Sequence, residues 1–236
     1  MTLPKYSVTF DIEWAPDSSI QKCLELLTEF NVKATFFATH HTDLNKEIIH
    51  QGHELGIHPN FLPGSSQGKS VDEIIETCLE FAPTAWCMRT HSLVQSSPLL
   101  HEIFSKYPQL TMDISLFMHK APHVQRTKWA FDGVFFDRIM YNWEDDAEFY
   151  KMNFSEESKK FFGPITVFDF HPIHVHLNSS NGSEYKRLKE SNVGIPLNSL
   201  NDKKVCELTN TSDGVHTFFR SVLASNSISI PLEEIR

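Results

Sequence analysis

Residues 6–37 have the sequence YSVTFDIEWAPDSSIQKCLELLTEFNVKATFF, in which a helix-like run separates two short strand-like runs. The runs at 6–10 and 33–37 are rich in β-branched and aromatic residues, as strands usually are. Between them, Ser19 is expected to cap a helix over 20–30, where apolar residues recur at helical spacing: Ile20, Cys23, Leu24, Leu27 and Phe30. The segment therefore predicts a strand–helix–strand unit with parallel strands.

The same alternation continues along the chain. It predicts helices at 43–51, 71–81 and 97–107, and strands at 54–57, 84–88, 110–112 and 165–170. We expect a strand pair within 129–138, a long polar loop over 178–201, a last helix capped at Thr211-Ser212 and running to Ala224, and a strand at 228–230. Repeated βα units predict an α/β protein whose parallel strands close into a barrel or form an open sheet. The 236 residues suit one domain over 1–236.

Composition excludes some partners. The formal net charge is −9, with 21 Lys plus Arg against 30 Asp plus Glu, so we expect no nucleic-acid partner. The four cysteines lack CxxC spacing and are expected to be buried thiols in a reducing compartment. The first residues lack the apolar run of a secretory signal, and no stretch is long and apolar enough to span a membrane. The expected location is therefore the cytoplasm.

Acids, imidazoles and a guanidinium follow the predicted strands, where α/β folds place their chemistry. These residues are Asp11 and Glu13, His58, Arg89 and His91, Asp113, and His171 and His174. Separately, each has an ordinary interpretation as a solvated acid, a structural histidine or a structural ion pair. His53, at the start of its strand, is expected to pack rather than bind a ligand. Together they predict one site at the carboxyl ends of the strands.

Mixed carboxylate and imidazole ligands suit Zn²⁺ or another divalent first-row ion with an open position for water. Asp11 and Glu13 offer a metal ligand and a general base. His171 suits a general acid, because its ordinary pKa lies near neutrality. Arg89 would keep the basic carboxylate ionised and fixed in orientation.

The motifs resemble those of the polysaccharide deacetylases with a NodB homology domain, carbohydrate esterase family 4. The matching segments lie in order along nearly the whole chain: Thr9-Phe10-Asp11, 32–37, Gly52 to His58, Arg89 and His171. The resemblance implies a distorted (β/α) barrel. It also implies that Asp11 is the catalytic base, Arg89 its partner, His58 a metal ligand and His171 the general acid.

Two departures from the family pattern affect the metal site. The family places a metal-binding Asp directly after the base, where this chain has Ile12, and a second metal histidine four residues after the first, where it has Leu62. Glu13 and His91 are the substitutes at hand. We therefore expect a site of Glu13, His58 and His91, with Asp11 as base or additional ligand. Zn²⁺ is the expected metal, with Co²⁺, Mn²⁺ and Ni²⁺ as alternatives.

This variant pattern is similar to that of the WbmS-like subgroup, which is linked to bacterial O-antigen sugar assembly. The resemblance implies removal of an N-acetyl or N-formyl group from an amino sugar, either nucleotide-linked or lipid-linked. Substrate contacts are expected from Trp14, Asn60, Asp113, Trp143 and His174, and His174 is also an alternative general acid. Two other functions stay open: a metal amidase acting on a non-sugar amide, and a degenerate carbohydrate-binding protein that has lost the metal.

Overall fold

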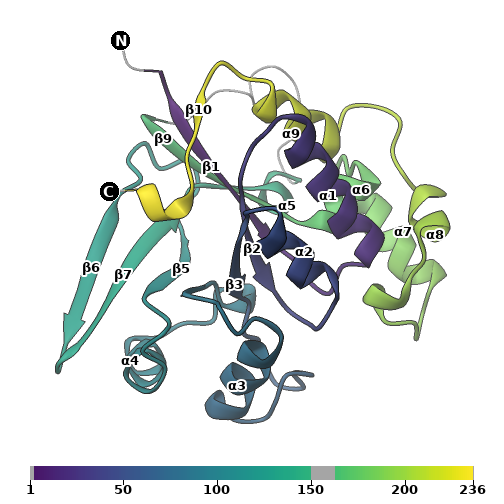
Figure 1. Ribbon diagram of the computed structural model, residues 1–236. Coiled ribbons are helices and arrows are strands. Elements are labelled where there is room, and N and C mark those ends of the chain that lie inside the picture. The colour runs from purple at the N-terminus through teal and green to yellow at the C-terminus, as the bar shows by residue number, and fades with distance from the viewer. Residues whose placement is uncertain (1–2, 150–162, 236) are drawn as a thin grey trace.

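The computed structural model describes residues 3–149 and 163–235, and within them one mixed sheet forms the centre of the molecule (Figure 1). Its order is β6-β7-β5-β4-β3-β2-β1-β9-β8, and β10 also pairs with β1. All neighbours are parallel except the β6–β7 hairpin. The ten strands are β1 Lys5–Asp11, β2 Thr35–Ala38, β3 Glu54–Ile57, β4 Cys87–Met88, β5 Met112–Phe117, β6 Arg126–Phe131, β7 Val134–Tyr141, β8 Trp143–Glu144, β9 Ile165–Phe170 and β10 Ile228–Ser229.

The run from β7 into β8 closes the sheet. β7 pairs with β5 on one side, and β8, two residues further on, pairs with β9 on the other. Asn142 bridges the break between them, because its side-chain oxygen accepts a hydrogen bond from the amide of Val167 at 2.9 Å. The predicted distorted (β/α) barrel is therefore confirmed, and its seam is the short, irregular contact around Asn142.

Helices cover the sheet in two groups (Figure 1). Helices α1, α2, α6 and α9 gather on one side of β1, whereas α4 lies beside the β6–β7 hairpin and α3 lies below β3, and the hairpin itself projects from the body. The helices of the described residues are α1 Asp17–Glu29, α2 Leu44–His50, α3 Val71–Phe81, α4 Ser97–Lys106, α5 Asp145–Glu148, α6 Pro172–Leu177, α7 Ser183–Ser191, α8 Asp202–Cys206 and α9 Val215–Leu223, with 3₁₀ turns η1 His91–Leu93, η3 Leu197–Ser199 and η4 Leu232–Glu234.

The core explains much of the high phenylalanine content. All residues of β1 after Lys5 are buried, as expected of a strand covered on both faces. Phe10 on β1 stacks on Phe36 at 4.6 Å between ring centroids and meets the edge of Phe219 on α9 at 5.5 Å. Cys23, Cys78 and Cys87 are buried free thiols, as predicted, whereas Cys206 is exposed. Within the described residues, no helix is long and apolar enough to cross a membrane.

Several sequence predictions of local structure were wrong. Helix α1 begins at Asp17 with Pro16 as its N-cap, so Ser19 lies inside the helix instead of capping it. The segment 178–201 is not one loop, because it contains α7. Helix α9 is capped at Gly214, whose amide donates to the Thr217 hydroxyl at 2.8 Å, rather than at 211–212. The sequence of α7 is mostly polar, so this short amphipathic helix resembled a loop.

Candidate active site and metal centre

The turn after β1 sets the geometry of the site. Ile12 continues the sheet, since its amide donates to the Phe37 carbonyl at 3.2 Å, and its side chain is buried in the core. Glu13 and Trp14 then adopt positive φ angles of 49° and 52°. Two successive non-glycine residues in the left-handed region are uncommon, and such residues cluster at functional sites. The turn carries the Glu13 side chain back over the end of the strand.

Glu13 meets two histidines from neighbouring strand ends. Its Oε1 lies 2.8 Å from His58 Nε2 and 2.6 Å from His91 Nδ1. His58 directly follows β3, and His91 begins the 3₁₀ turn after β4, where its amide donates to the Pro59 carbonyl at 2.9 Å. Burial alone would raise the pKa of Glu13, but the hydrogen bonds and charge of the two histidines outweigh it and lower that pKa well below its ordinary value.

These three residues have the chemistry of a divalent-metal site. One ligand atom from each lies within 4.8 Å of the others. His58 Nδ1 is buried without a hydrogen-bond partner and lies 3.6 Å from Asp11 Oδ1, so this imidazole has a nitrogen left over for a ligand. Glu13 and His91 are 22% and 20% exposed, whereas His58 is 1% exposed, so the cluster opens to solvent on one side. One oxygen and two nitrogen donors with an open side fit Zn²⁺.

Asp11 is held beside this cluster by a buried arginine. Arg89 Nη1 lies 2.9 Å from Asp11 Oδ1, and the Arg89 side chain is fully buried. Its guanidinium carbon lies 4.5 Å from the ring centroid of Phe37 and 4.1 Å from that of Tyr141, so two aromatic faces fix its plane. Arg89 therefore orients the Asp11 carboxylate and stabilises its charge.

A second buried carboxyl group shares this arginine. Asp169, on β9, contacts Arg89 Nη1, and Thr9 on β1 donates its hydroxyl to Asp169 at 2.9 Å. Burial raises the pKa of Asp169 well above its ordinary value, and the nearby charge of Asp11 raises it further. The positive charge of Arg89 opposes this rise, and Arg89 therefore pairs with two buried carboxyl groups, Asp11 and Asp169.

His171 forms a dyad with Asp145. His171 Nδ1 lies 2.6 Å from Asp145 Oδ1, and the amide of His171 donates to Asp145 Oδ2 at 2.8 Å. Burial alone would lower the pKa of His171, but the Asp145 carboxylate outweighs burial and raises that pKa well above its ordinary value. Ligand atoms of His171, Asp11 and Asp169 lie within 4.8 Å of one another. The dyad therefore places a cationic imidazole beside Asp11.

His174 has different surroundings. Its Nδ1 lies 3.0 Å from the Ser179 hydroxyl, and its ring packs edge-on against Phe149 at 4.8 Å and Tyr185 at 5.1 Å. Burial, assisted by the charge of His171, lowers the pKa of His174 well below its ordinary value. A neutral, enclosed imidazole is a poor proton donor, so of the two histidines His171 suits the general acid better.

Two predicted substrate contacts remain near the site. The Trp14 ring lies edge-on to His91 at 5.4 Å and is half-buried, which leaves part of it available to a ligand. The side-chain oxygen of Asn60 accepts the amide of Leu62 at 2.9 Å, so it shapes the turn after β3 while the residue stays half-buried. Contact of either residue with a substrate stays a prediction.

Two other predicted substrate contacts were wrong. Trp143 is fully buried, and its ring stacks on Phe218 at 4.7 Å, so it belongs to the core. Asp113 lies inside β5, is fully buried and pairs with Arg138 Nε at 2.7 Å. The predicted strand ended too early, which placed Asp113 at a strand end and made it a candidate.

Sequence reasoning placed Asp145 only in a segment expected to line the substrate groove, did not pair it with His171, and overlooked Asp169. A sequence signal existed for Asp169, because an acid inside the apolar run Ile165–Phe170 needs a buried partner. No such sequence signal existed for Asp145, because its contact with His171 depends on the pairing of β8 with β9. The fully buried Arg89 was a candidate, and the structure brings it to Asp11 as expected.

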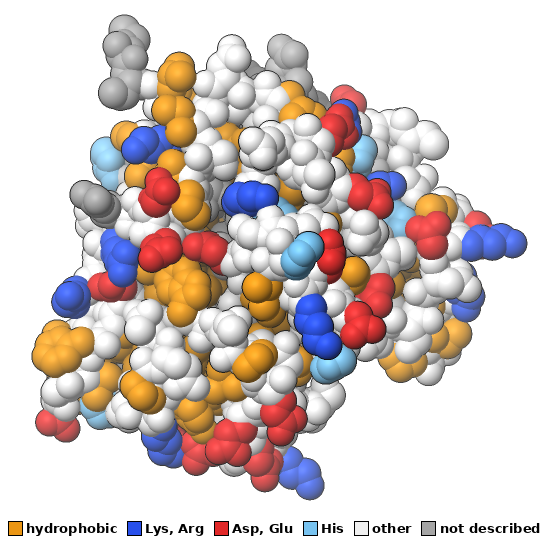
Figure 2. All heavy atoms as spheres, in the orientation of Figure 1, with side chains coloured by type: hydrophobic (Ala, Val, Ile, Leu, Met, Phe, Trp, Pro, Cys, Tyr) orange, Lys and Arg blue, Asp and Glu red, His pale blue; other side chains and the backbone are white. Residues whose placement is uncertain are grey.

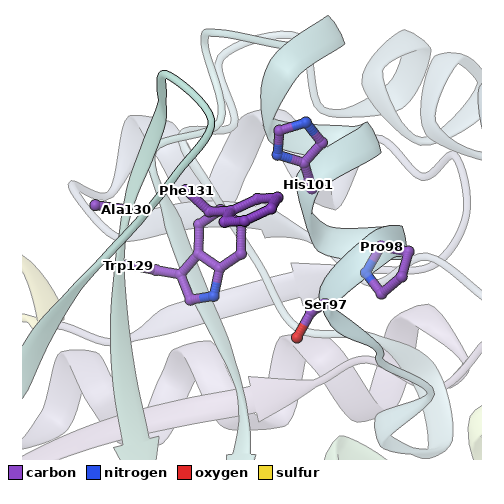
Figure 3. Close-up of a pocket in the computed structure, with 6 residues that line it drawn as sticks. All are labelled: Ser97, Pro98, His101, Trp129, Ala130 and Phe131. Carbon is purple, nitrogen blue, oxygen red and sulfur yellow. The ribbon is translucent and has the colours of Figure 1, made fainter.

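A separate apolar hollow lies between α4 and the β6–β7 hairpin (Figure 3). Its volume is about 610 Å³, and none of Glu13, His58 and His91 lines it; the lining residues are Ser97, Pro98, His101, Trp129, Ala130 and Phe131. The hollow therefore belongs to the hairpin region and adds nothing to the cluster at the strand ends.

On the face drawn in Figure 2, acidic and basic side chains are intermixed.

The barrel, with acids and imidazoles gathered at its carboxyl-terminal strand ends, defines an α/β-barrel protein with an enzyme-type site. A family model described as WbmS-like polysaccharide deacetylase matches residues 8–189. The chain therefore belongs to the WbmS-like polysaccharide deacetylase family, and the predicted family resemblance is confirmed. A search of curated proteins finds no match.

Solved structures agree with this assignment. The chain is 33% identical to WbmS of Bordetella bronchiseptica, a protein assigned as a polysaccharide deacetylase involved in O-antigen biosynthesis; the match covers 93% of this chain and 89% of that one, with a TM-score of 0.78. The Bc1960 peptidoglycan N-acetylglucosamine deacetylase matches at 13% identity over 98% and 87% of the two chains, with a TM-score of 0.50. A mutant of BA3943, a CE4 family pseudoenzyme with restored activity, matches at 13% over 99% and 67%, with a TM-score of 0.52. The last two show likeness of fold alone.

Proposed function

We propose that the protein is a metal-dependent hydrolase that removes an N-acyl group from an amino sugar during assembly of a bacterial surface polysaccharide. One observation carries the proposal. Glu13, His58 and His91 offer ligand atoms within 4.8 Å of one another, and Asp11 lies beside them, 3.6 Å from His58. WbmS supports the polysaccharide assignment through its own description as an O-antigen biosynthesis protein.

Glu13, His58 and His91 would hold the cation, for which we propose Zn²⁺. When bound, such an ion lowers the pKa of water to about 7 and polarises a substrate carbonyl. Asp11 suits the removal of the water proton, because Arg89 pairs with its carboxylate and fixes its orientation, and because it lies between the ligand cluster and His171.

His171 would protonate the leaving nitrogen. Its Nδ1 donates to Asp145, so its Nε2 is the atom that delivers the proton. The overall step adds water across the amide C–N bond and yields a carboxylate and an amine. Trp14, half-buried at the open side of the cluster, would stack on the sugar ring. A nucleotide- or lipid-linked amino sugar in the cytoplasm is the proposed substrate.

Amine release from a panel of N-acetyl and N-formyl amino sugars, free and nucleotide-linked, tests the proposal. We expect release by the Zn²⁺-loaded protein, and its loss in Asp11→Asn and His171→Gln. Release only from non-sugar amides would favour a metal amidase. Stoichiometric sugar binding without metal uptake or release would favour a degenerate binding protein.

A further inference from the structure

A second cluster of ligand-type side chains lies away from the candidate active site, between α6 and α8. His176 Nε2 lies 3.5 Å from Cys206 Sγ and 3.4 Å from Asp202 Oδ1, and Cys206 Sγ lies 3.6 Å from Asp202 Oδ2. Asp202 and Cys206 are four residues apart on α8, so their side chains share one helix face, the face that is turned to His176. Imidazole, thiol and carboxylate thus converge at one point.

His176 is presented to this point in a fixed orientation. Its side chain is 2% exposed, and its Nδ1 lies 2.9 Å from the buried Ser19 hydroxyl on α1. A hydrogen bond of this kind on the far nitrogen is a common feature of metal-binding histidines, because it fixes the ring and the tautomer. The nitrogen that faces Cys206 and Asp202 is therefore the one free to bind a cation.

The charges around the cluster oppose one another. The positive charge of Lys22 acts on His176 and opposes a cation there, and the Asp202 carboxylate offsets it. Binding of a metal by Cys206 would release the thiol proton to solvent.

We propose that His176, Asp202 and Cys206 form a second Zn²⁺ site, distinct from the Glu13 cluster. A nitrogen, a thiolate and a carboxylate oxygen suit this borderline-soft ion, and three protein ligands leave one position for water. Asp202 and Cys206 are exposed, so the ion reaches the site directly from solvent. Bound Zn²⁺ would tie α8 to α6, the helix that starts directly after His171.

Titration of the metal-free full-length protein with Co²⁺ tests this site independently of the proposed function. Cys206 is a ligand only here, and the Glu13 cluster contains no thiolate, so a thiolate-to-Co²⁺ charge-transfer band in the near ultraviolet reports on this site alone. We expect the band in the wild type and in Glu13→Gln. We expect its loss in Cys206→Ser, together with loss of one equivalent of Zn²⁺ by mass spectrometry under native conditions.

Two further variants sharpen the test. Asp202→Asn keeps every cysteine and should weaken the band at limiting Co²⁺, whereas Glu207→Gln, an exposed acid on the same segment, should leave it unchanged. Cys23, Cys78 and Cys87 are buried and should not contribute. Absence of the band in the wild type, or its persistence in Cys206→Ser, would overturn the proposal whatever the outcome for deacetylation.

Discussion

Replacing Asp145 by Asn should remove the support for the protonated form of His171. The change deletes a negative charge 2.6 Å from His171 Nδ1 but keeps an oxygen that can accept the His171 amide, so the local fold should survive. Because a hydrogen bond to a charged group contributes about 1.5–3 kcal/mol, the ratio of protonated to neutral His171 at a given pH should fall about ten- to hundred-fold.

The contact between Asp145 and His171 also determines how the activity should change with pH. Asp145 raises the pKa of His171, so the wild-type imidazolium persists to higher pH. In Asp145→Asn it should be lost at lower pH, and deacetylation should fall below the wild-type rate by a factor that grows from pH 6 towards pH 8. The stability that the ion pair adds is likewise complete below the ordinary histidine pKa and is lost as pH rises through the folded-state pKa.

NMR titration of histidine-labelled protein measures this directly, with the His171 signal assigned from its absence in His171→Gln. Asp146→Asn is the comparison variant, since it removes the same charge from an exposed neighbouring acid. The charge of Asp146 also raises the pKa of His171, but less than Asp145 does, so the shift in this variant should be smaller. If His171 titrates at the same pH in the wild type and in Asp145→Asn, the assigned role of Asp145 is wrong.

Three further predictions concern stability. Arg89→Met should lower the free energy of unfolding in urea by about 3–5 kcal/mol, because it leaves the buried Asp11 without its partner; a loss below about 1 kcal/mol would contradict this role. Gly56→Ala should cost about 1–3 kcal/mol, since an added Cβ would lie 2.8 Å from the Cys87 carbonyl oxygen; an unchanged melting temperature would refute the close packing. In chelator-treated protein, Glu13→Gln should be less stable than the wild type at pH 7. The difference should shrink as pH falls below about 4, because the lowered pKa of Glu13 adds stability only while its carboxylate is ionised. A difference that does not change with pH would contradict this role of Glu13.

The sequence predicted the helices and strands best where apolar residues recur with a regular period. The β1–α1–β2 unit follows from apolar periodicity, and helix Val71–Phe81 and strand Glu54–Ile57 were predicted with the bounds that the structure has. The position of Glu13 beside His58 and His91 was predicted as well. The turn that places it there was not, because nothing in the sequence indicates positive φ angles at the non-glycine residues Glu13 and Trp14.

Contacts between distant segments were harder to predict. The dyad of Asp145 with His171 depends on the pairing of β8 with β9, and both strands are placed by the irregular closure at Asn142 rather than by a local pattern. The burial of Trp143 has the same cause. Its position next to polar residues indicated a surface, while the closed barrel turns the ring into the core.

The central claim is that Glu13, His58 and His91 hold one divalent cation. Crystals grown with Zn²⁺ and measured on both sides of its absorption edge would test it in an anomalous difference map. We predict a peak about 2.0–2.2 Å from a Glu13 oxygen and from one nitrogen of each histidine, with Asp11 next to it. A map with Zn²⁺ bound elsewhere in the molecule and no peak among these three residues would contradict the claim.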